Sequence, residues 1–139
     1  MIIGALKEKN KYENRVSISP DETRSYIKSG HQILIEKSAG LSSGFLDSSY
    51  KEAGASIVSS KEILKKSQIL IKIQLPTKEE VKEMQSNSIL VSQVNLNINQ
   101  EIIKLLNLKK ISVFALERIP RITRAQNMDI LSSQANLAG

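Results

Sequence analysis

Six short apolar runs, each separated from the next by a polar or amphipathic segment, constrain the fold of this chain more than any other feature. The runs are Ile2 to Leu6, Gln32 to Glu36, Ala55 to Val58, Gln68 to Gln74, Ser88 to Val91 and Ile111 to Leu116. Strands that alternate with helices form βαβ units, and near-continuous apolar strands are typical of a sheet covered on both faces. The sequence therefore predicts an α/β fold: a mostly parallel, Rossmann-like (flavodoxin-like) doubly wound sheet with helices on both faces.

The segments between these runs carry helix signals. Ser19 is placed to cap a helix that has Pro20 and two acidic residues in its first turn and ends at Gly30. Thr77 is placed to cap a second helix, which begins TKEEVKEMQ. Three further helices are expected over Asp47 to Ala53, over Ser60 to Lys66 and from the cap Asn99 through Leu106.

Length and composition limit the kinds of fold, site and partner that this chain can have. With 139 residues, 40% of them hydrophobic, the chain suits one domain with a packed core. It has no cysteine, and His31, its only histidine, is expected in a turn, so no metal site is predicted. The net charge of +6 comes mostly from lysines mixed with Glu, and 4% of residues are aromatic, so no nucleic-acid partner is predicted.

Membrane-spanning and phosphate-binding patterns are missing from the sequence. No apolar run approaches the ~18–20 residues that cross a bilayer, and charges directly follow the short N-terminal run, so we expect a soluble chain without a signal peptide. The loop Lys37 to Phe45 has two glycines with GxxxG spacing, and neither GxG nor GxxxxGK occurs anywhere. The usual pyrophosphate-binding glycines are therefore not available.

Lys72 lies inside the apolar run Gln68 to Gln74, which is unusual for a charged residue. One interpretation is a lysine at a strand end whose ammonium reaches out to water. The other is a positive group at the carboxyl end of a sheet strand, where ligands of open α/β sheets bind. The residues alone favour neither interpretation.

The last nineteen residues, Arg121 to Gly139, contain neither Lys nor Glu. Thr123 and Gln126 match a capping box, so we expect a helix over residues 123–138 with one apolar and one polar stripe. Its amides and hydroxyls make directional hydrogen bonds at close range, which fits a docking surface. Packing of an ordinary helix against the sheet explains the same pattern.

Three stretches resemble one family. The closing segment Pro120 to Gly139 resembles the alpha subunit of proton-translocating NAD(P) transhydrogenases. The stretch Glu13 to Pro20, ENRVSISP, and the stretch Ile69 to Pro76, ILIKIQLP, resemble the same family and the related alanine dehydrogenases. The resemblance covers the whole chain, and its closing motif is the most specific part.

This resemblance implies that residues 1–139 are a single lobe, the N-terminal one of two Rossmann-like lobes that hold NAD(H) in a cleft. The helix over residues 123–138 would lead to the second lobe, which carries the glycine motif. The family passes hydride from NADH to NADP(H) on a partner chain and couples the transfer to proton translocation. The implied partners are the remaining alpha-subunit lobe, the membrane-bound beta subunit and a second copy in a homodimer. The implied location is cytoplasmic, on the inner face of the plasma membrane.

The resemblance also implies a cofactor site in the closing segment. In the family, the RxxRAQxxDxLSS motif faces the nicotinamide end of NAD. By matching position, Arg121 and Gln126 would contact the carboxamide or ribose. Asp129 and Ser132 would form a hydrogen-bonded layer beneath these two residues. The residues implied to bind the cofactor are Arg121, Gln126, Asn127, Met128, Asp129, Ser132 and Ser133. No catalytic residue is assigned, because hydride transfer needs orientation of the cofactor and no general acid.

Two further positions match residues that bind the substrate carboxylate in alanine dehydrogenases, namely Arg15 and Lys72. Those enzymes also use a histidine in the loop that here reads Gln93 to Asn99 and has none. We therefore interpret Arg15 and Lys72 as a possible vestige of a substrate site, paired with acidic neighbours. The family continues beyond the position of Gly139, so we expect a truncated subunit that is inactive alone. The alternatives are an alanine dehydrogenase-like oxidoreductase and a non-catalytic interaction remnant.

Overall fold

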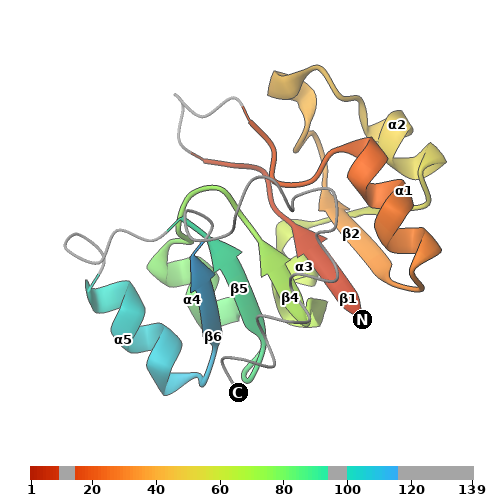
Figure 1. The fold of residues 1–139 in the computed structure, drawn as a ribbon. Helices are drawn as coiled ribbons and strands as arrows, with labels where there is room; N and C mark the ends of the chain where they lie inside the picture. The colour runs from red at the N-terminus through yellow and green to blue at the C-terminus, as the bar shows by residue number, and fades with distance from the viewer. Residues whose placement is uncertain (10–14, 94–99, 116–139) are drawn as a thin grey trace.

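A computed structural model describes residues 1–9, 15–93 and 100–115 of the chain. Strands and helices alternate along these residues (Figure 1). The elements are β1 (Ile2–Ala5), α1 (Pro20–Lys28), β2 (Gln32–Glu36), the short 3-10 helix η1 (Leu41–Ser43), α2 (Asp47–Glu52), β3 (Ser56–Val58), α3 (Ser60–Lys66), β4 (Ile69–Ile71), α4 (Lys78–Glu83), β5 (Ile89–Ser92), α5 (Gln100–Leu108) and β6 (Ser112–Ala115). The predicted helix over residues 123–138 and the loop over residues 94–99 lie outside the described residues.

The six strands form one sheet in the order β3-β2-β1-β4-β5-β6. Every neighbouring pair is parallel. This is the strand order of Rossmann sheets, 3-2-1-4-5-6, and it differs from the flavodoxin order, 2-1-3-4-5. The prediction of a doubly wound parallel sheet is confirmed, and its topology is Rossmann-like. Strands β2 and β3 are added on one side of β1, and β4, β5 and β6 are added on its other side. The topological switch point therefore lies between β1 and β4.

The sheet has a hydrophobic core on each face. Successive residues of a strand belong to different cores, because their side chains point to opposite faces. In β4, Ile69 and Ile71 belong to one core and Leu70 to the other. In β2, Ile33 and Ile35 are likewise separated from Leu34. Both faces of the central strands are therefore buried, which explains why the strands read as apolar runs without polar alternation.

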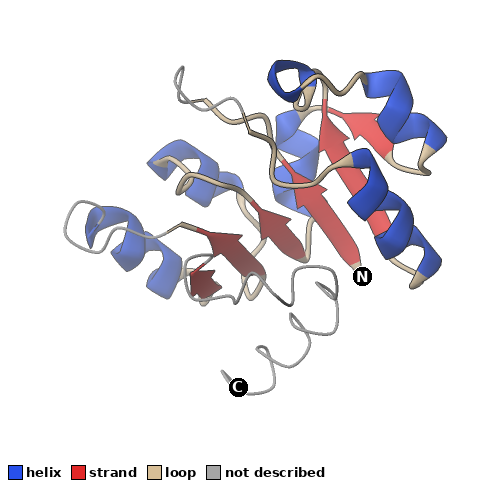
Figure 2. Cartoon of the chain, turned by 45° about the horizontal axis from the view of Figure 1, so that its top comes forward, coloured by secondary structure: helices blue, strands red, loops and turns tan. Residues whose placement is uncertain are grey.

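Helices cover both faces of the sheet (Figure 2). Tyr26 of α1 and Tyr50 of α2 join the core that contains Ile3. Helices α3, α4 and α5 supply Ile63, Val81 and Leu106 to the other core. The change of face between α2 and α3 follows from the right-handed crossover rule, because the chain now builds the sheet in the opposite direction.

The predicted caps are formed. Ser19 and Glu22 make a reciprocal capping box at the start of α1. Thr77 and Glu80 make another at α4. Gly30, predicted to end the first helix, has φ of +91°, a conformation that glycine adopts without strain. Ser19 and Thr77 follow loops at the carboxyl edge of the sheet, whereas Gly30 precedes β2 at the amino edge.

Helix α4 ends on a lysine from the turn after α5. The ammonium of Lys109 donates to the main-chain oxygens of Val81 at 3.1 Å, Lys82 at 2.7 Å and Met84 at 2.5 Å. A cation at this end supplies donors to carbonyls of the last turn, where regular helix bonds run out, and is favoured by the helix dipole. The side chain therefore ties α4 to the segment that leads into β6.

Candidate functional site

Two charged residues meet at the topological switch point. Strands β1 and β4 are in register, with Ala5 opposite Ile71. Glu8 follows β1 by three residues, and Lys72 follows β4 directly. The carboxyl ends of parallel strands lie at the same edge of a sheet, and the crevice at the switch point of such sheets is the usual place for a ligand.

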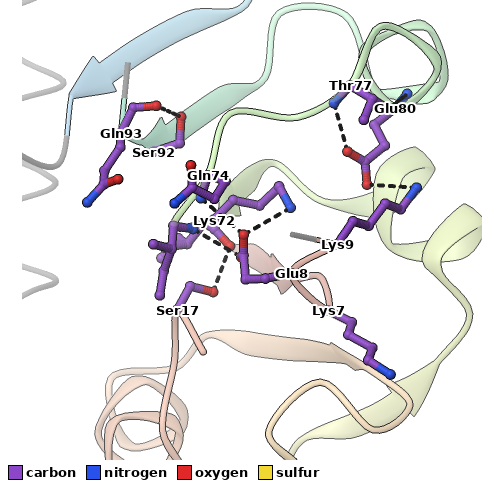
Figure 3. A network of polar contacts seen from close by, with 12 residues as sticks. Lys7, Glu8, Lys9, Ser17, Lys72, Gln74, Thr77, Glu80, Ser92 and Gln93 are labelled. Atoms are coloured by element: carbon purple, nitrogen blue, oxygen red, sulfur yellow. Dashed lines mark hydrogen bonds and ion pairs between the residues drawn. The ribbon is translucent and has the colours of Figure 1, made fainter. Parts of the chain in front are cut away.

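The Glu8 carboxylate receives three donors (Figure 3). The Lys72 ammonium lies 3.3 Å from Oε1, and each of the two side chains is only 2% exposed. The main-chain N–H of Ile73 donates to Oε2 at 3.0 Å, and that of Gln74 donates to Oε1 at 3.0 Å. A buried ion pair needs hydrogen bonds of this kind, because water no longer solvates either charge.

The turn that carries these donors is fixed by its other neighbours. The N–H of Lys72 donates to the Val91 oxygen at 2.9 Å, and the N–H of Gln93 donates to the Ile73 oxygen at 3.0 Å. On the other side, the Ser17 hydroxyl donates to the Ile71 oxygen at 2.8 Å. Main-chain pairing with the end of β5 therefore continues beyond the last residue of β4.

The three residues after Leu6 contact three different parts of the edge. The main-chain N–H of Lys7 donates to the Glu36 carboxylate at 2.8 Å, at the end of β2. Glu8 joins the turn after β4, and the Lys9 ammonium lies 3.5 Å from Glu80 Oε2 in α4. That oxygen is buried and, among the described residues, has no hydrogen bond, so the ion pair with Lys9 compensates its charge. The segment after β1 thus ties both halves of the sheet together.

These contacts decide between the two interpretations of Lys72. The interpretation that its ammonium reaches water is wrong, because the side chain is 2% exposed. The predicted strand also ends earlier, at Ile71, so Lys72 lies at the carboxyl edge as the other interpretation requires. The predicted pairing with an acidic neighbour is confirmed for Lys72. For Arg15, whose side chain is exposed, the pairing stays a prediction.

Glu8 was not identified from the sequence, where it falls within a polar connection. A usable signal existed, because a lysine inside an apolar strand requires a nearby counter-charge. The strand order then restricts that partner to the loops after β1 and β5. Strand order is a property of the whole fold, so the partner could not be read from local pattern.

The cofactor residues implied by the family resemblance lie outside the described residues, and their assignment stays a prediction. They are Arg121, Gln126, Asn127, Met128, Asp129, Ser132 and Ser133. Over residues 1–9, 15–93 and 100–115, no group of three or more potential metal ligands lies together. No helix within the same ranges is long and apolar enough to cross a membrane.

Burial is the largest cause of a shifted pKa at His31 and at Tyr50. His31 lies in the turn before β2, as predicted, and burial lowers its pKa, with the N-terminal ammonium as a smaller cause. Burial raises the pKa of the Tyr50 phenol to about 12, with smaller contributions from Glu22 and Asp47. The Tyr50 hydroxyl donates to the Ile18 oxygen at 2.7 Å. Tyr50 therefore serves the packing of the core that contains Ile18 and Ile71.

The sequence profile described as "Alanine dehydrogenase/PNT, N-terminal domain" matches residues 4–138. The chain belongs to this family. Over its whole length it is 40% identical to the NAD(P) transhydrogenase subunit alpha of Haemophilus influenzae, of which it covers 27%. The family resemblance read from the three motifs is therefore confirmed, and the chain spans about a quarter of the length of this relative.

Solved structures of the alanine dehydrogenase/PNT family have the same fold. The transhydrogenase from Sinorhizobium meliloti is similar with a TM-score of 0.82 and 33% identity, over 99% of this chain and 41% of that chain. An L-alanine dehydrogenase is similar with a TM-score of 0.78 and 32% identity, over 83% of this chain and 32% of that chain. Both comparisons support the Rossmann-like assignment.

Proposed function

We propose that this chain is the first lobe of the NAD-binding region of a proton-translocating NAD(P) transhydrogenase alpha subunit. In the assembled enzyme, hydride passes from NADH to NADP(H) on a partner chain, and the transfer is coupled to proton translocation. This lobe contacts the nicotinamide end of NAD(H). It acts in a homodimer, with the remainder of the alpha subunit and a beta subunit, at the cytoplasmic face of the plasma membrane.

The 40% identity with a transhydrogenase alpha subunit, extending over all 139 residues, carries this proposal. The described part of the chain adds a second argument. The Glu8 carboxylate occupies the switch point between β1 and β4, and the first strand-to-helix loop has no GxG motif. These residues do not fit a pyrophosphate, so the proposal assigns that group to the remaining lobe.

The chemistry of hydride transfer belongs to NAD(H) itself. In the proposal, Arg121 and Gln126 fix the plane of the nicotinamide ring through its carboxamide or ribose. Asp129 and Ser132 form the hydrogen-bonded layer beneath them. Orientation of this kind contributes to the rate because the two reacting carbons must approach closely.

A hydride-transfer assay tests the proposal at the level of the lobe. The isolated chain, incubated with NADH and an NADP analogue, is expected to show no turnover, since it lacks the pyrophosphate site and the NADP(H) chain. Turnover by the isolated chain would contradict the assignment as a partial site.

Substitution in the complete alpha subunit tests the site residues. Gln126→Ala and Arg121→Ala are each expected to reduce hydride transfer at least about tenfold, the effect of misplacing a reacting group. Lys78→Ala, on the exposed surface of α4, is the matched control and should leave the rate unchanged. If the loss of activity in the two site variants is accompanied by a matching loss of Tm, the two residues have a structural role instead.

Alanine dehydrogenase activity is the second candidate, favoured by the similarity to an L-alanine dehydrogenase structure. It is weakened by the loop Gln93 to Asn99, which has no histidine. Oxidation of NADH in the presence of pyruvate and ammonia, measured with the complete subunit, distinguishes the two. Pyruvate-dependent oxidation without any NADP analogue would favour the second candidate.

A further inference from the structure

One half of one sheet face has no helix packed over it among the residues that the structure describes. Its six side chains come from β4, β5 and β6 and form two rows across these parallel strands. One row is Ile69, Ile89 and Ser112, and the other is Ile71, Val91 and Phe114. The five apolar members belong to the core on this face or pack against it. We call this surface the β4–β6 face.

The described helices lie elsewhere on the sheet. Helices α1 and α2 make their main strand contacts with β2 and β3, and α3, α4 and α5 pack on the opposite face (Figure 1). The segment before α1 reaches one corner of the β4–β6 face, where Ser17 is bonded to Ile71. Yet Ile69, Ile71 and Val91 are only 4%, 6% and 2% exposed. Side chains this well buried are covered by other atoms of the same chain, so residues 1–139 supply the cover themselves.

The closing segment is the part of the chain best placed to supply this cover. The described residues end with Ala115 of β6, which borders the face, and residues 116–139 follow directly. A helix after β6 can return over the β4–β6 face, because α5 already packs against β6 from the other side. The face is about 10 Å wide from β4 to β6, and one helix has about the same diameter.

The sequence of the closing segment matches this position. On the helix expected over residues 123–138, the apolar stripe consists of Met128, Leu131, Ala135 and Ala138, and the polar stripe of Gln126, Asp129, Ser133 and Asn136. At 3.6 residues per turn the two stripes lie about 160° apart, on opposite sides of the helix. The helix can therefore bury one stripe completely while the other stays accessible.

We propose that the β4–β6 face is the docking surface for the apolar stripe of the closing segment. The polar stripe then points away from the sheet and is available to NAD(H). This role of the polar stripe rests on the proposed function, whereas the docking itself does not. The two interpretations of the closing segment, packing against the sheet and docking of a ligand, then describe opposite stripes of one helix.

Pairs of introduced cysteines test the docking in the 139-residue chain, which has no cysteine of its own. Phe114→Cys combined with Leu131→Cys places one thiol on the face and one on the apolar stripe. The matched control combines Phe114→Cys with Ser133→Cys, on the polar stripe. A short bis-maleimide should cross-link the first pair within one chain at least about five times faster than the control, because docking raises the effective concentration of the thiols. Mass spectrometry of the intact chain measures the product.

A second pair samples the other row of the face. Ile89→Cys combined with Ala135→Cys should cross-link faster than Ile89→Cys combined with Asn136→Cys, for the same reason. The two rows together allow for either position of the helix along the strands. If neither pair exceeds its control, the proposal is overturned.

Other occupants of the face give other products. Cross-linking of Phe114→Cys with Leu131→Cys between two chains, instead of within one, would assign the face to a second copy and overturn the proposal. If the face instead awaits the remaining part of the alpha subunit, the single thiol of Ile89→Cys is open in this chain. It would then react with a maleimide as fast as Lys104→Cys on the exposed surface of α5, and this result would also overturn the proposal.

Charged substitutions in the closing segment give a measurement that leaves the sheet unchanged, so it applies even if the Phe114 and Ile89 variants do not fold. Leu131→Asp should lower the Tm by roughly 5–10 °C, because it places a charge against apolar strands. Ser133→Asp, on the polar stripe, should shift the Tm by less than about 2 °C. Equal shifts in the two variants would contradict the docking of the apolar stripe.

Discussion

Two lysine–glutamate pairs in this domain have the same chemistry and opposite surroundings. Lys72 and Glu8 meet between β1 and β4, where each side chain is 2% exposed. Lys78 and Glu101 join α4 to α5 on the surface, with side chains 48% and 73% exposed. The first pair is surrounded by main-chain donors and apolar cores, and the second by water.

Burial determines how much each partner depends on the other. Water solvates an exposed charge about as well as its partner does, so such a pair contributes little to stability. A buried charge has lost its water, and removing its partner leaves an uncompensated charge in the interior. The comparison therefore predicts that the same type of substitution has very different effects in the two pairs.

The largest effect is expected at the buried pair. Lys72→Met leaves the Glu8 carboxylate buried beside two N–H groups, and should lower the free energy of unfolding by about 3–5 kcal/mol. Urea denaturation measures this loss. Adding Glu8→Gln removes both charges and should recover part of it. A loss below about 1 kcal/mol for Lys72→Met would place the pair in the exposed class.

An intermediate effect is expected at Lys109, whose ammonium is bonded to three main-chain oxygens at the end of α4. Lys109→Met should lower the free energy of unfolding by about 1–2 kcal/mol, because carbonyls at a helix end lose a charged donor. Lys104→Met, on the exposed surface of α5, is the matched control for loss of a lysine charge. Equal effects of the two substitutions in urea denaturation would show that the helix-end contacts contribute nothing.

The smallest effect is expected at the exposed pair, where Lys78→Ala should lower the Tm only slightly, because water solvates each charge about as well as its partner does. The hydrogen bond with Lys78, and then its charge, lower the pKa of Glu101 below 4.5. The hydrogen bond with Glu101, and then its charge, raise the pKa of Lys78 above 10.5. Any stability that the pair contributes is thus present between pH 4.5 and 10.5.

The pH dependence of unfolding tests the prediction for the exposed pair. The contribution is lost as pH falls through the lowered pKa of Glu101, and also as pH rises through the raised pKa of Lys78. Unfolding of the original chain and of Lys78→Ala should therefore differ most near neutral pH and converge below pH 4.5. A large difference at neutral pH that persists in 1 M salt would contradict the assignment as an exposed, screened pair.

Local chemistry made most of the fold predictable. Ser19 and Thr77 begin helices where their caps indicate, and Gly30 ends one, because these signals act within a single turn of chain. The six strands were found because burial on both faces requires apolar runs. The strand end at Ile71 was missed, because the apolar pattern and main-chain bonds to the end of β5 both continue as far as Ile73.

The site was less predictable, because it depends on which strands are neighbours. Lys72 was recognised as unusual, but its partner Glu8 lies 64 residues away in the sequence. Only the order β1-β4 brings the two together, and that order depends on the packing of the whole sheet. The cofactor residues around Gln126 were predicted from resemblance to a family, and they lie outside the described residues.

The central position of β1 has a consequence for how the chain is made. This strand pairs with β2 on one side and with β4 on the other. During synthesis β2 emerges first, and β4 begins at Ile69, 33 residues after β2 ends at Glu36 (69 − 36). At about 5–20 residues per second, one edge of β1 waits roughly 2–7 s for its partner strand. An apolar strand with an open edge is prone to pair with other chains, so this interval is when a nascent chain most needs protection by chaperones.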